Sequence, residues 1–493
     1  MFFIAMASLC LNLTHKIILK SKIIYVPHNI DLEELTRKNP PSFEFDYEYA
    51  YFILYTILKE SYWKFNKITD WIDFHNYKRV RKYMVRRCSM ELQLDRRDYN
   101  LHFDYLYLNN ILWREQYSDN VCRSFQIAPK YFGEQVRFIK IHKPKTLRLL
   151  KPTEGARDAH YPLNKWFDTK LLINTESASE SLNLSFNDDR NYFKYIKNCQ
   201  LIVNLNNGDI NFSRKEYSDD RLHSDFTLFP SVLRKHLRYD GQSLGEVDIS
   251  SSVPFFMYYL FLSIVDINQI NQEVYTNFFK KPRFYEPALK KTVSIVKLDP
   301  LEVEKFGKDI LQGNYYLQFV DMFDDEYYKS HAQFVLKRDF NYSKEDKLAI
   351  VKKQILSWPN ARANKFKSEQ AVFKKLYPTI HDFLTKFKRR RYIARDGIFK
   401  KNAEKIAKES KIDIKETFQQ HKKVSHLFLQ LESYVMLDIV ARKWNKSRSK
   451  IPFFTLHDCI ITTKDNVEEF RRFMEEVFTT VVGVSPNFKT KLF

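Results

Sequence analysis

The chain has 493 residues, of which 44% are hydrophobic, enough for several domains with large cores. Lys and Arg number 81 against 60 Asp and Glu, and the net charge of +21 indicates a polyanionic partner. Nine glycines without a glycine-rich loop exclude P-loop and Rossmann folds, and five scattered cysteines without a CxxC pair argue against a disulfide scaffold or a zinc site.

The location of the protein is predicted from the same features. Its cysteine usage fits a reducing compartment, so we expect a cytoplasmic protein. No stretch approaches the roughly 20 apolar residues of a membrane span, and no membrane partner is expected. The first eleven residues lack a basic segment and a convincing cleavage site, which favours a buried strand or a misplaced start over a signal peptide. We further expect a monomer.

Residues 1–155 are predicted to form a basic N-terminal region. Short β-branched runs at 16–19 and 22–26 predict strands, and the aromatic-rich residues 47–65 and basic residues 77–94 predict helices. Residues 137–151 then carry Lys, Arg and His without any acid. Cations spaced in this way suit phosphate groups, and the alternative is an ordinary solvated face.

Residues 156–216 are predicted to connect this region to the rest of the chain. Residues 152–162 have the composition of a linker. The residues after them mix helical and polar loop patterns. The apolar run at 201–205, Leu-Ile-Val-Asn-Leu, predicts a strand.

A strand followed by a helix is predicted around Asp248. Residues 243–249 alternate polar and apolar side chains, as a strand with one buried face does. Three serines able to cap a helix, and Pro254 suited to its first position, then introduce the apolar helix 255–265. A carboxylate at such a strand end is held rigidly and can bind a metal ion. The alternative is a capping Asp at the end of an ordinary buried strand.

Residues 301–424 are predicted to be strongly helical. A helix over 344–358 carries several lysines, and a cationic helix of this kind suits an incoming triphosphate. The densest basic cluster of the chain follows at 386–391. We expect this cluster to contact a nucleic-acid backbone. The residues expected to do so are Lys388, Arg389 and Arg390.

Residues 425–493 contain a second candidate carboxylate. An apolar helix is predicted over 427–444, and residues 452–463 predict a β-hairpin with His457 and Asp458 at its bend. An amphipathic helix over 467–477 follows. One interpretation is a turn stabilised by His and Asp. The other is a carboxylate brought beside Asp248 to share divalent cations.

Taken together and in order, these segments resemble the motifs of the family A DNA polymerases and of their relatives, the single-subunit phage-type RNA polymerases. Asp248-Ile249-Ser250 resembles motif A, and His457-Asp458 resembles motif C. The segment from Tyr217 to Ser224 resembles the family's Gly-Arg-Leu-Ser segment upstream of motif A. The segment Lys375–Leu384 resembles the Tyr-Pro segment that follows the fingers helix in the family. Gln430 stands where the family has a primer-template Gln before motif C. The resemblance covers residues 217–480.

The resemblance implies an α+β, right-hand polymerase fold with an antiparallel palm sheet, helix-rich fingers and a basic, thumb-like N-terminal region. The palm would comprise residues 217–300 and 425–493, and the fingers residues 301–424. A proofreading exonuclease is not expected. Its Asp-x-Glu pattern occurs at Asp31-Leu-Glu33, but these acids lead into a predicted helix start, where acidic residues are common.

The same resemblance implies template-directed nucleotidyl transfer with two Mg²⁺ ions, or Mn²⁺, as cofactors. Asp248, Asp458 and the carbonyl of Ile249 would hold the ions. The partners would be a DNA template and primer, with dNTPs as the nucleotide substrates and NTPs as the alternative. His457 would support the primer end; the alternative is a histidine satisfied by the hairpin backbone.

The remaining roles implied by the resemblance are binding contacts. Arg221 and Gln430 would hold the primer or template. Lys352 and Lys353 would bind the triphosphate, with Lys352 preferred, although the Tyr-Gly of the family's motif B is absent here. Val253 stands where the family has a Glu that excludes a 2′-hydroxyl, which predicts weak discrimination between dNTPs and NTPs.

Two alternatives stay open. An RNA polymerase or primase-like enzyme of the same superfamily is compatible with Val253 and Cys459, whereas the short interval from Arg221 to Asp248 favours the DNA enzymes. A non-catalytic nucleic-acid-binding relative is favoured by the degraded motif B. The presence of both Asp248 and Asp458 argues against it.

Overall fold

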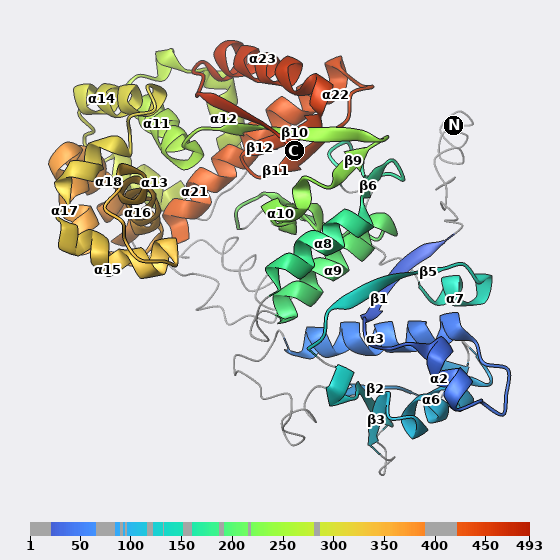
Figure 1. Ribbon diagram of the computed structural model, residues 1–493. Helices are drawn as coiled ribbons and strands as arrows, with labels where there is room; N and C mark the ends of the chain where they lie inside the picture. Colours follow the sequence, from blue (N-terminus) through green and yellow to red (C-terminus); the bar gives the residue numbers. More distant parts are fainter. Residues whose placement is uncertain are drawn as a thin grey trace, which may run out of the picture. The chain divides into compact units, whose positions relative to one another are not determined.

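The chain forms two compact units. The computed structural model describes residues 21–65, 84–88, 92–93, 96–115, 122–131, 133–150, 160–186, 192–214, 218–280, 286–389 and 422–493. The first unit comprises Met1–Gly155, Phe167–Asn211 and Leu228–Gly241, and the second comprises Ala156–Trp166, Phe212–Thr227 and Gln242–Phe493. Both units combine helices with antiparallel strands, which confirms the predicted α+β class (Figure 1).

This division does not follow the predicted region boundaries everywhere. Residues 228–241, predicted as palm, cluster with the first unit, and residues 156–216, predicted as a connecting region, are shared by both units. The assignment of palm, fingers and thumb-like regions therefore stays a prediction.

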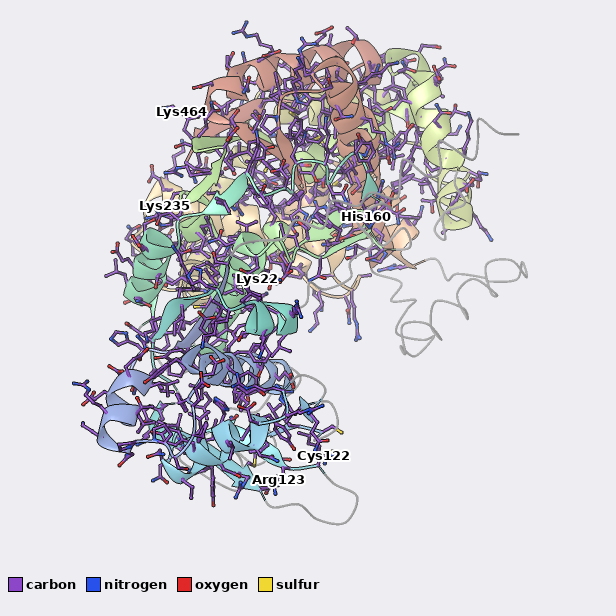
Figure 2. All side chains as sticks on the ribbon, turned by 90° about the vertical axis from the view of Figure 1, so that its right-hand side faces the viewer. Lys22, Cys122, Arg123, His160, Lys235 and Lys464 are labelled. Atoms are coloured by element: carbon purple, nitrogen blue, oxygen red, sulfur yellow. The ribbon has the colours of Figure 1, made fainter. Side chains whose placement is uncertain are left out.

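The first unit is built on helix α3 (Tyr47–Phe65), which packs against strand β1 (Lys22–Pro27). Strand β1 pairs antiparallel with β5 (Val136–Ile141), so that Tyr25 lies opposite Phe138. The helix at 47–65 and the strand at 22–26 are thus confirmed. Lys22, labelled in Figure 2, donates to the carbonyl of Leu150, which ties the start of β1 to the end of the basic run.

Two sequence-based predictions for this unit are wrong. Residues 201–205 lie in helix α9 (Tyr192–Asn206), not in a strand. Because this part of α9 is buried on most sides, its sequence is apolar except at Asn204 and shows no helical period. Val85 and Arg86 form strand β2 inside the helix predicted over 77–94, and residues 77–83 lie outside the described residues.

Asp31 begins a helix, as the sequence pattern indicated. Its carboxylate accepts a hydrogen bond of 2.9 Å from the backbone N–H of Glu34, in the first turn of α2 (Leu32–Lys38). The pair Asp31 and Glu33 therefore belongs to a helix N-terminus. Further helices and strands among the described residues of this unit are β3 (Leu112–Glu115), β4 (Ser124–Ile127), α6 (Tyr99–Leu108), η2 (Pro129–Tyr131), α7 (Pro144–Leu149), β6 (Leu171–Ile173), α8 (Thr175–Ser185), α10 (Ser231–Arg234) and β9 (Leu237–Tyr239).

Strand β10 (Gln242–Ile249) lies at the centre of the second unit. It pairs antiparallel with both β12 (Cys459–Thr463) and β13 (Phe488–Leu492), and β12 also pairs with β11 (Phe453–Leu456) (Figure 1). The predicted strand at 243–249 and the predicted hairpin at 452–463 are confirmed. Strands β7 (Phe212–Arg214) and β8 (Leu222–Ser224) form a separate pair.

The strand leads into helix α11 (Ser252–Val265), which is buried along most of its length. No serine side chain caps this helix, contrary to the prediction; instead Ser251 adopts φ +58°, in the left-handed region. Helix α11 packs on α14 (Pro300–Leu311), where Gly307 admits the ring of Tyr258. A Cβ at Gly307 would lie 2.2 Å from Cε2 of Tyr258, so only glycine permits this approach.

The helical prediction for 301–424 is confirmed over residues 301–389, and residues 390–421 lie outside the described residues. The helix predicted over 344–358 is α16 (Lys344–Ser357). The other helices among the described residues between 266 and 389 are η6 (Ile267–Gln269), α12 (Gln272–Lys280), α13 (Glu286–Val293), η7 (Leu317–Met322), α15 (Asp325–Leu336), η8 (Trp358–Asn360), α17 (Lys367–Leu376) and α18 (Pro378–Arg389).

A long helix precedes the hairpin. It runs through α21 (Lys422–Ser433), the π-helical η9 (Tyr434–Ala441) and α22 (Arg442–Ser447). Contrary to the sequence-based expectation, its stretch Val424–Ser447 is long and apolar enough to cross a membrane, by length and composition. However, 72% of its apolar window is buried inside the protein, as in a core helix. Helix α23 (Val467–Val477), which was predicted, and η11 (Phe478–Val482) complete the unit.

Candidate active site

Asp248 lies at the end of β10, beside the turn into α11. It is paired with Cys459 of β12 on one side and with Lys489 of β13 on the other. The left-handed conformation of Ser251 turns the chain from strand to helix within a few residues. That conformation costs a non-glycine residue roughly 1–2 kcal/mol. The carboxylate is therefore held at a sharp strand–helix turn.

Asp458 lies in the two-residue bend between β11 and β12. The backbone N–H of Ile249 donates to the carbonyl of Asp458 over 3.3 Å, so the bend is joined to the end of β10. His457, the other bend residue, has φ +58°, a conformation more usual for glycine. The structure thus brings together Asp248, near the end of β10, and Asp458, just before the adjacent strand β12, although they are far apart in the sequence.

The electrostatics of the pair reflect this proximity. Burial raises the pKa of Asp248 to about 7, and the charges of Asp458 and Glu246 raise it too, whereas Lys352 opposes them. Burial also raises the pKa of Asp458, against the opposing charges of Arg221 and Lys352. Two neighbouring, partly buried carboxylates are stabilised in their charged forms by a further cation.

The residues present fit a divalent cation. Mg²⁺ in proteins is usually bound by one or two carboxylates together with phosphate oxygens and water, and Asp248 and Asp458 supply that number. The Oγ of Ser250 is buried and forms no hydrogen bond within the described residues, so it too is open to a ligand or water. No group of three or more His, Cys, Asp or Glu that could hold a metal occurs among the residues that the structure describes.

Of the two lysines predicted to bind a triphosphate, Lys352 is the one that faces the carboxylates. Its charge lowers the pKa of both Asp248 and Asp458, and its Nζ lies 5.9 Å from the centre of the Tyr316 ring. Lys353 is also exposed, but it lies about 100° further round α16. Val253 is partly buried in the first turn of α11.

Arg221 does not extend freely into solvent but is paired with Glu432, which the sequence analysis missed. Its Nε and Nη2 donate to the same carboxylate oxygen, Oε1, over 2.8 and 2.5 Å. The other oxygen, Oε2, accepts from Oγ of Ser252 over 2.6 Å. Glu432 is fully buried, and burial raises its pKa to about 7. The signal available in the sequence was an acid within an apolar helix, since a buried acid requires a partner.

Gln430 is buried and holds the segment that carries Arg221. Its Nε2 donates to the carbonyl of Ser218 over 2.6 Å, and Oγ of Ser433 donates to the carbonyl of Asp219 over 3.0 Å. Only 2% of Gln430 is exposed. The predicted contact of Gln430 with primer or template is therefore wrong for this conformation, because the amide is already used inside the protein.

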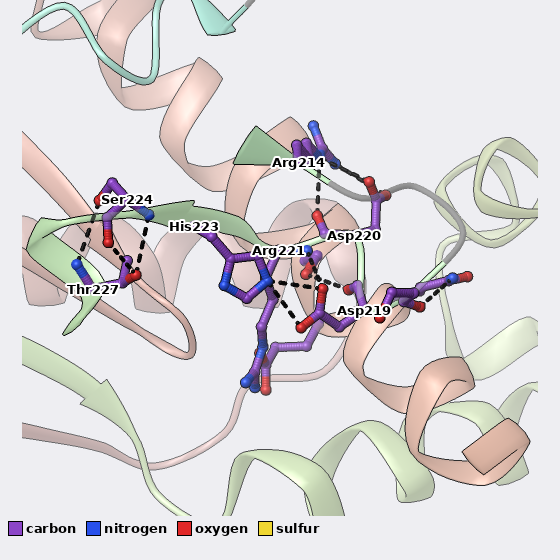
Figure 3. Close-up of polar contacts among 11 residues, drawn as sticks. Arg214, Asp219, Asp220, Arg221, His223, Ser224 and Thr227 are labelled. Carbon is purple, nitrogen blue, oxygen red and sulfur yellow. Dashed lines mark hydrogen bonds and ion pairs between the residues drawn. The ribbon is translucent and has the colours of Figure 1, made fainter. Parts of the chain in front are cut away.

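Further polar contacts fix the same segment (Figure 3). Arg214 donates to the carboxylates of both Asp220 and Asp438. His223 Nε2 lies 3.1 Å from both carboxylate oxygens of Asp219. The ring centres of His223 and His457 are 5.9 Å apart, which places the predicted site residue His457 next to this segment.

The prediction for the basic cluster at 386–391 is partly wrong. Lys388 is only 3% exposed; its Nζ donates to the carbonyl of Trp358 and lies 4.6 Å from the indole centre. Burial lowers the pKa of Lys388 to about 7. A side chain enclosed in this way cannot reach a phosphate. Arg389 is exposed at the end of α18, and Arg390 lies outside the described residues.

Comparisons with known proteins give a distant structural similarity and no match in sequence. No family model matches the chain, and no curated protein matches it. Among solved structures, it is similar to the POL domain of Pol1 from M. smegmatis in complex with a DNA primer-template and dNTP, with a TM-score of 0.26 and 10% sequence identity. That match covers 71% of this chain and 60% of the other. The similarity is distant and assigns the chain to no family.

Proposed function

We propose that this chain is a template-directed nucleotidyltransferase similar to the family A DNA polymerases. The main observation in support is the position of Asp248 near the end of β10 and of Asp458 in the bend that leads into the adjacent antiparallel strand β12. Nucleotidyl transfer uses two divalent cations roughly 4 Å apart, and a pair of close carboxylates is the ligand set that such cations need.

In this proposal, Asp248, Asp458 and the carbonyl of Ile249 hold Mg²⁺ or Mn²⁺. When bound, the ions supply Lewis-acid stabilisation of the transferring phosphoryl group and promote ionisation of the primer 3′-hydroxyl. Lys352 binds the triphosphate by charge-assisted hydrogen bonds, since its charge already acts on both carboxylates. His457 supports the primer end.

The proposed fold is a right hand. The sheet β11–β12–β10 with β13 would form the palm, and the helices from α14 to α18 the fingers. The net charge of +21, and exposed cations such as Arg389, suit binding of a DNA template and primer by contacts to phosphates. The basic N-terminal region would take part in that binding.

Synthesis of RNA is the second candidate function. Val253 lies in the first turn of α11, close after Asp248. Its side chain has no polar atom that could form a hydrogen bond within the proposed nucleotide site. An apolar residue there leaves room for the 2′-hydroxyl of a ribonucleotide. A non-catalytic nucleic-acid binder is the third reading, and it predicts binding without synthesis.

Primer extension separates these functions. The purified protein is given a primed DNA template with dNTPs or NTPs in separate reactions, each with Mg²⁺ or Mn²⁺ and with a chelator as control. Extension with dNTPs supports the DNA polymerase, and extension with NTPs alone identifies an RNA polymerase. Tight, salt-sensitive DNA binding without extension by either set would overturn the proposed activity.

A further inference from the structure

We propose that Glu432 keeps the Asp248–Asp458 pair available to divalent cations by holding the guanidinium of Arg221 away from Asp458. The inference rests on the proposed function, because it assigns Glu432 a role at the proposed metal site. Glu432 would act through Arg221 and is therefore a positioning residue.

The contacts of Arg221 show which acid it prefers. Two of its N–H groups donate to one oxygen of Glu432, while its charge still lowers the pKa of Asp458. Arg221 thus lies within electrostatic reach of two acids and forms hydrogen bonds to one of them. Only 18% of its side chain is exposed, so solvent offers the guanidinium little alternative.

The acid that binds Arg221 is itself held in place. The Oε2 of Glu432 accepts from Ser252, at the start of α11, so the carboxylate connects the Arg221 segment to the helix that follows Asp248. On the same long helix, Gln430 and Ser433 bind the carbonyls of residues 218 and 219. Arg221 and Glu432 are therefore fixed opposite each other by backbone contacts as well as by their own ion pair.

The charges around the site explain why this matters. Four acids interact there with three cations. The acids are Asp248, Asp458, Glu432 and Glu246, and the cations are Arg221, Lys352 and Lys489. With all seven ionised, the site has an excess of one negative charge. Without the charge of Glu432 the excess disappears. Because Arg221 always stays protonated, its guanidinium would then form an ion pair with Asp458. It would therefore compete with a metal ion for that carboxylate.

Direct metal binding tests this idea without relying on activity. Mn²⁺ binding to the full-length protein is measured by calorimetry or electron paramagnetic resonance, in the absence of nucleic acid and nucleotide. Glu432→Gln keeps the size and hydrogen-bonding capacity of the side chain but removes its charge. We expect Mn²⁺ affinity to fall about tenfold or more.

The double variant Arg221→Gln/Glu432→Gln provides the decisive comparison. It restores the excess of one negative charge and removes the competing guanidinium, so affinity should return to within about threefold of the original protein. Glu369→Gln is the matched control: Glu369 on α17 is also buried and accepts a hydrogen bond from the Tyr327 hydroxyl. This control should leave Mn²⁺ affinity unchanged. Thermal unfolding checks that each variant is folded.

The outcomes distinguish the inference from the proposed function. Unchanged Mn²⁺ affinity in Glu432→Gln, or equal weakening in the single and double variants, overturns the role of Glu432. Metal binding that behaves as expected, with no nucleotide addition by the original protein, overturns the proposed function and leaves the role of Glu432 intact. Mn²⁺ binding that is insensitive to substitution of Asp248 and Asp458 overturns both.

Discussion

The backbone amide of Ile249 donates a hydrogen bond to the carbonyl of Asp458, which fastens the end of β10 to the bend between β11 and β12. Asp248 precedes that amide by one residue and is paired with Cys459, the residue after Asp458. The two carboxylates are therefore placed by main-chain pairing. Changing either side chain should leave the fold intact, which makes substitution at these positions a clean test.

Asp248→Ala and Asp458→Ala should each abolish nucleotide addition while DNA binding persists. Loss of a carboxylate that holds a catalytic cation removes several kcal/mol of transition-state stabilisation, about a thousandfold in rate or more. Binding should persist because it depends on Lys and Arg contacts to phosphates, and it should weaken steeply with salt. Primer extension and fluorescence anisotropy measure the two properties. Equal loss of nucleotide addition and DNA binding would make these aspartates structural. As a control, Asp465→Ala, at an exposed position of the same unit, should alter neither nucleotide addition nor DNA binding.

Lys352→Ala should weaken nucleotide binding, and Lys353→Ala should not. The charge of Lys352 acts on Asp248 and Asp458, whereas Lys353 lies on another side of α16. A lost charge-assisted contact costs about 1.5–3 kcal/mol, which corresponds to a rise in KM of roughly 10-fold to 150-fold. Steady-state kinetics of single-nucleotide addition measure the effect. A larger effect at Lys353 would place the triphosphate elsewhere.

The elements that surround the candidate carboxylates were predictable because their patterns are local. The alternation of polar and apolar residues before Asp248 specifies a strand with one buried face, and the hairpin carries its only charged residue, Asp458, at its bend. Pairing of the two strands followed from the motif order, not from the physics of either strand alone. The register that joins Ile249 to Asp458 required the structure.

The predictions for individual site residues were wrong where composition and helical periodicity lead to different conclusions. Lys388 belongs to the densest basic cluster, but it also occupies the buried side of the strongly amphipathic α18, together with Leu384 and Phe387. Composition identified the cluster, whereas the helical period decided the burial of Lys388. Glu432 and Gln430 present the opposite case. Polar residues on an apolar helix were interpreted as ligand contacts or overlooked, and tertiary partners from distant segments satisfy both.

Gly307→Ala should destabilise the second unit by about 1–3 kcal/mol. The added Cβ would lie 2.2 Å from Cε2 of Tyr258, far inside contact distance, so α11 and α14 would have to separate or the ring would have to move. The same substitution in a Tyr258→Leu background should cost less, because the clashing ring is absent. Urea denaturation of the four proteins measures the coupling. Additive effects would mean that the ring is not the obstacle.

Lys388→Met should stabilise the protein most near and below neutral pH. Burial lowers the pKa of Lys388 to about 7 in the folded state, against about 10.4 in an unfolded chain. Between these values the unfolded chain binds more protons, so the stability of the original protein increases as the pH rises. The advantage of the methionine variant, about 1–3 kcal/mol at pH 7, should therefore shrink towards pH 10. Urea midpoints across this range test it, with the exposed Lys386→Met as control. A constant difference at all pH values would contradict the assignment.

The choice of sugar should be weak, with measurable incorporation of ribonucleotides. By the resemblance to the family A polymerases, Val253 stands where those enzymes have a hydrogen-bonding Glu. Tyr258, an aromatic on the same helix, is packed against Gly307 of α14. An apolar wall that merely tolerates a hydroxyl discriminates only about 100-fold, because no buried polar group is left unpaired by the wrong substrate. Incorporation ratios for matched dNTP and NTP pairs, measured on one template, decide the question. A preference for dNTPs beyond about 10⁴ would show that another residue excludes the 2′-hydroxyl. Tyr316, whose ring lies 5.9 Å from Nζ of Lys352, would then be the first residue to substitute.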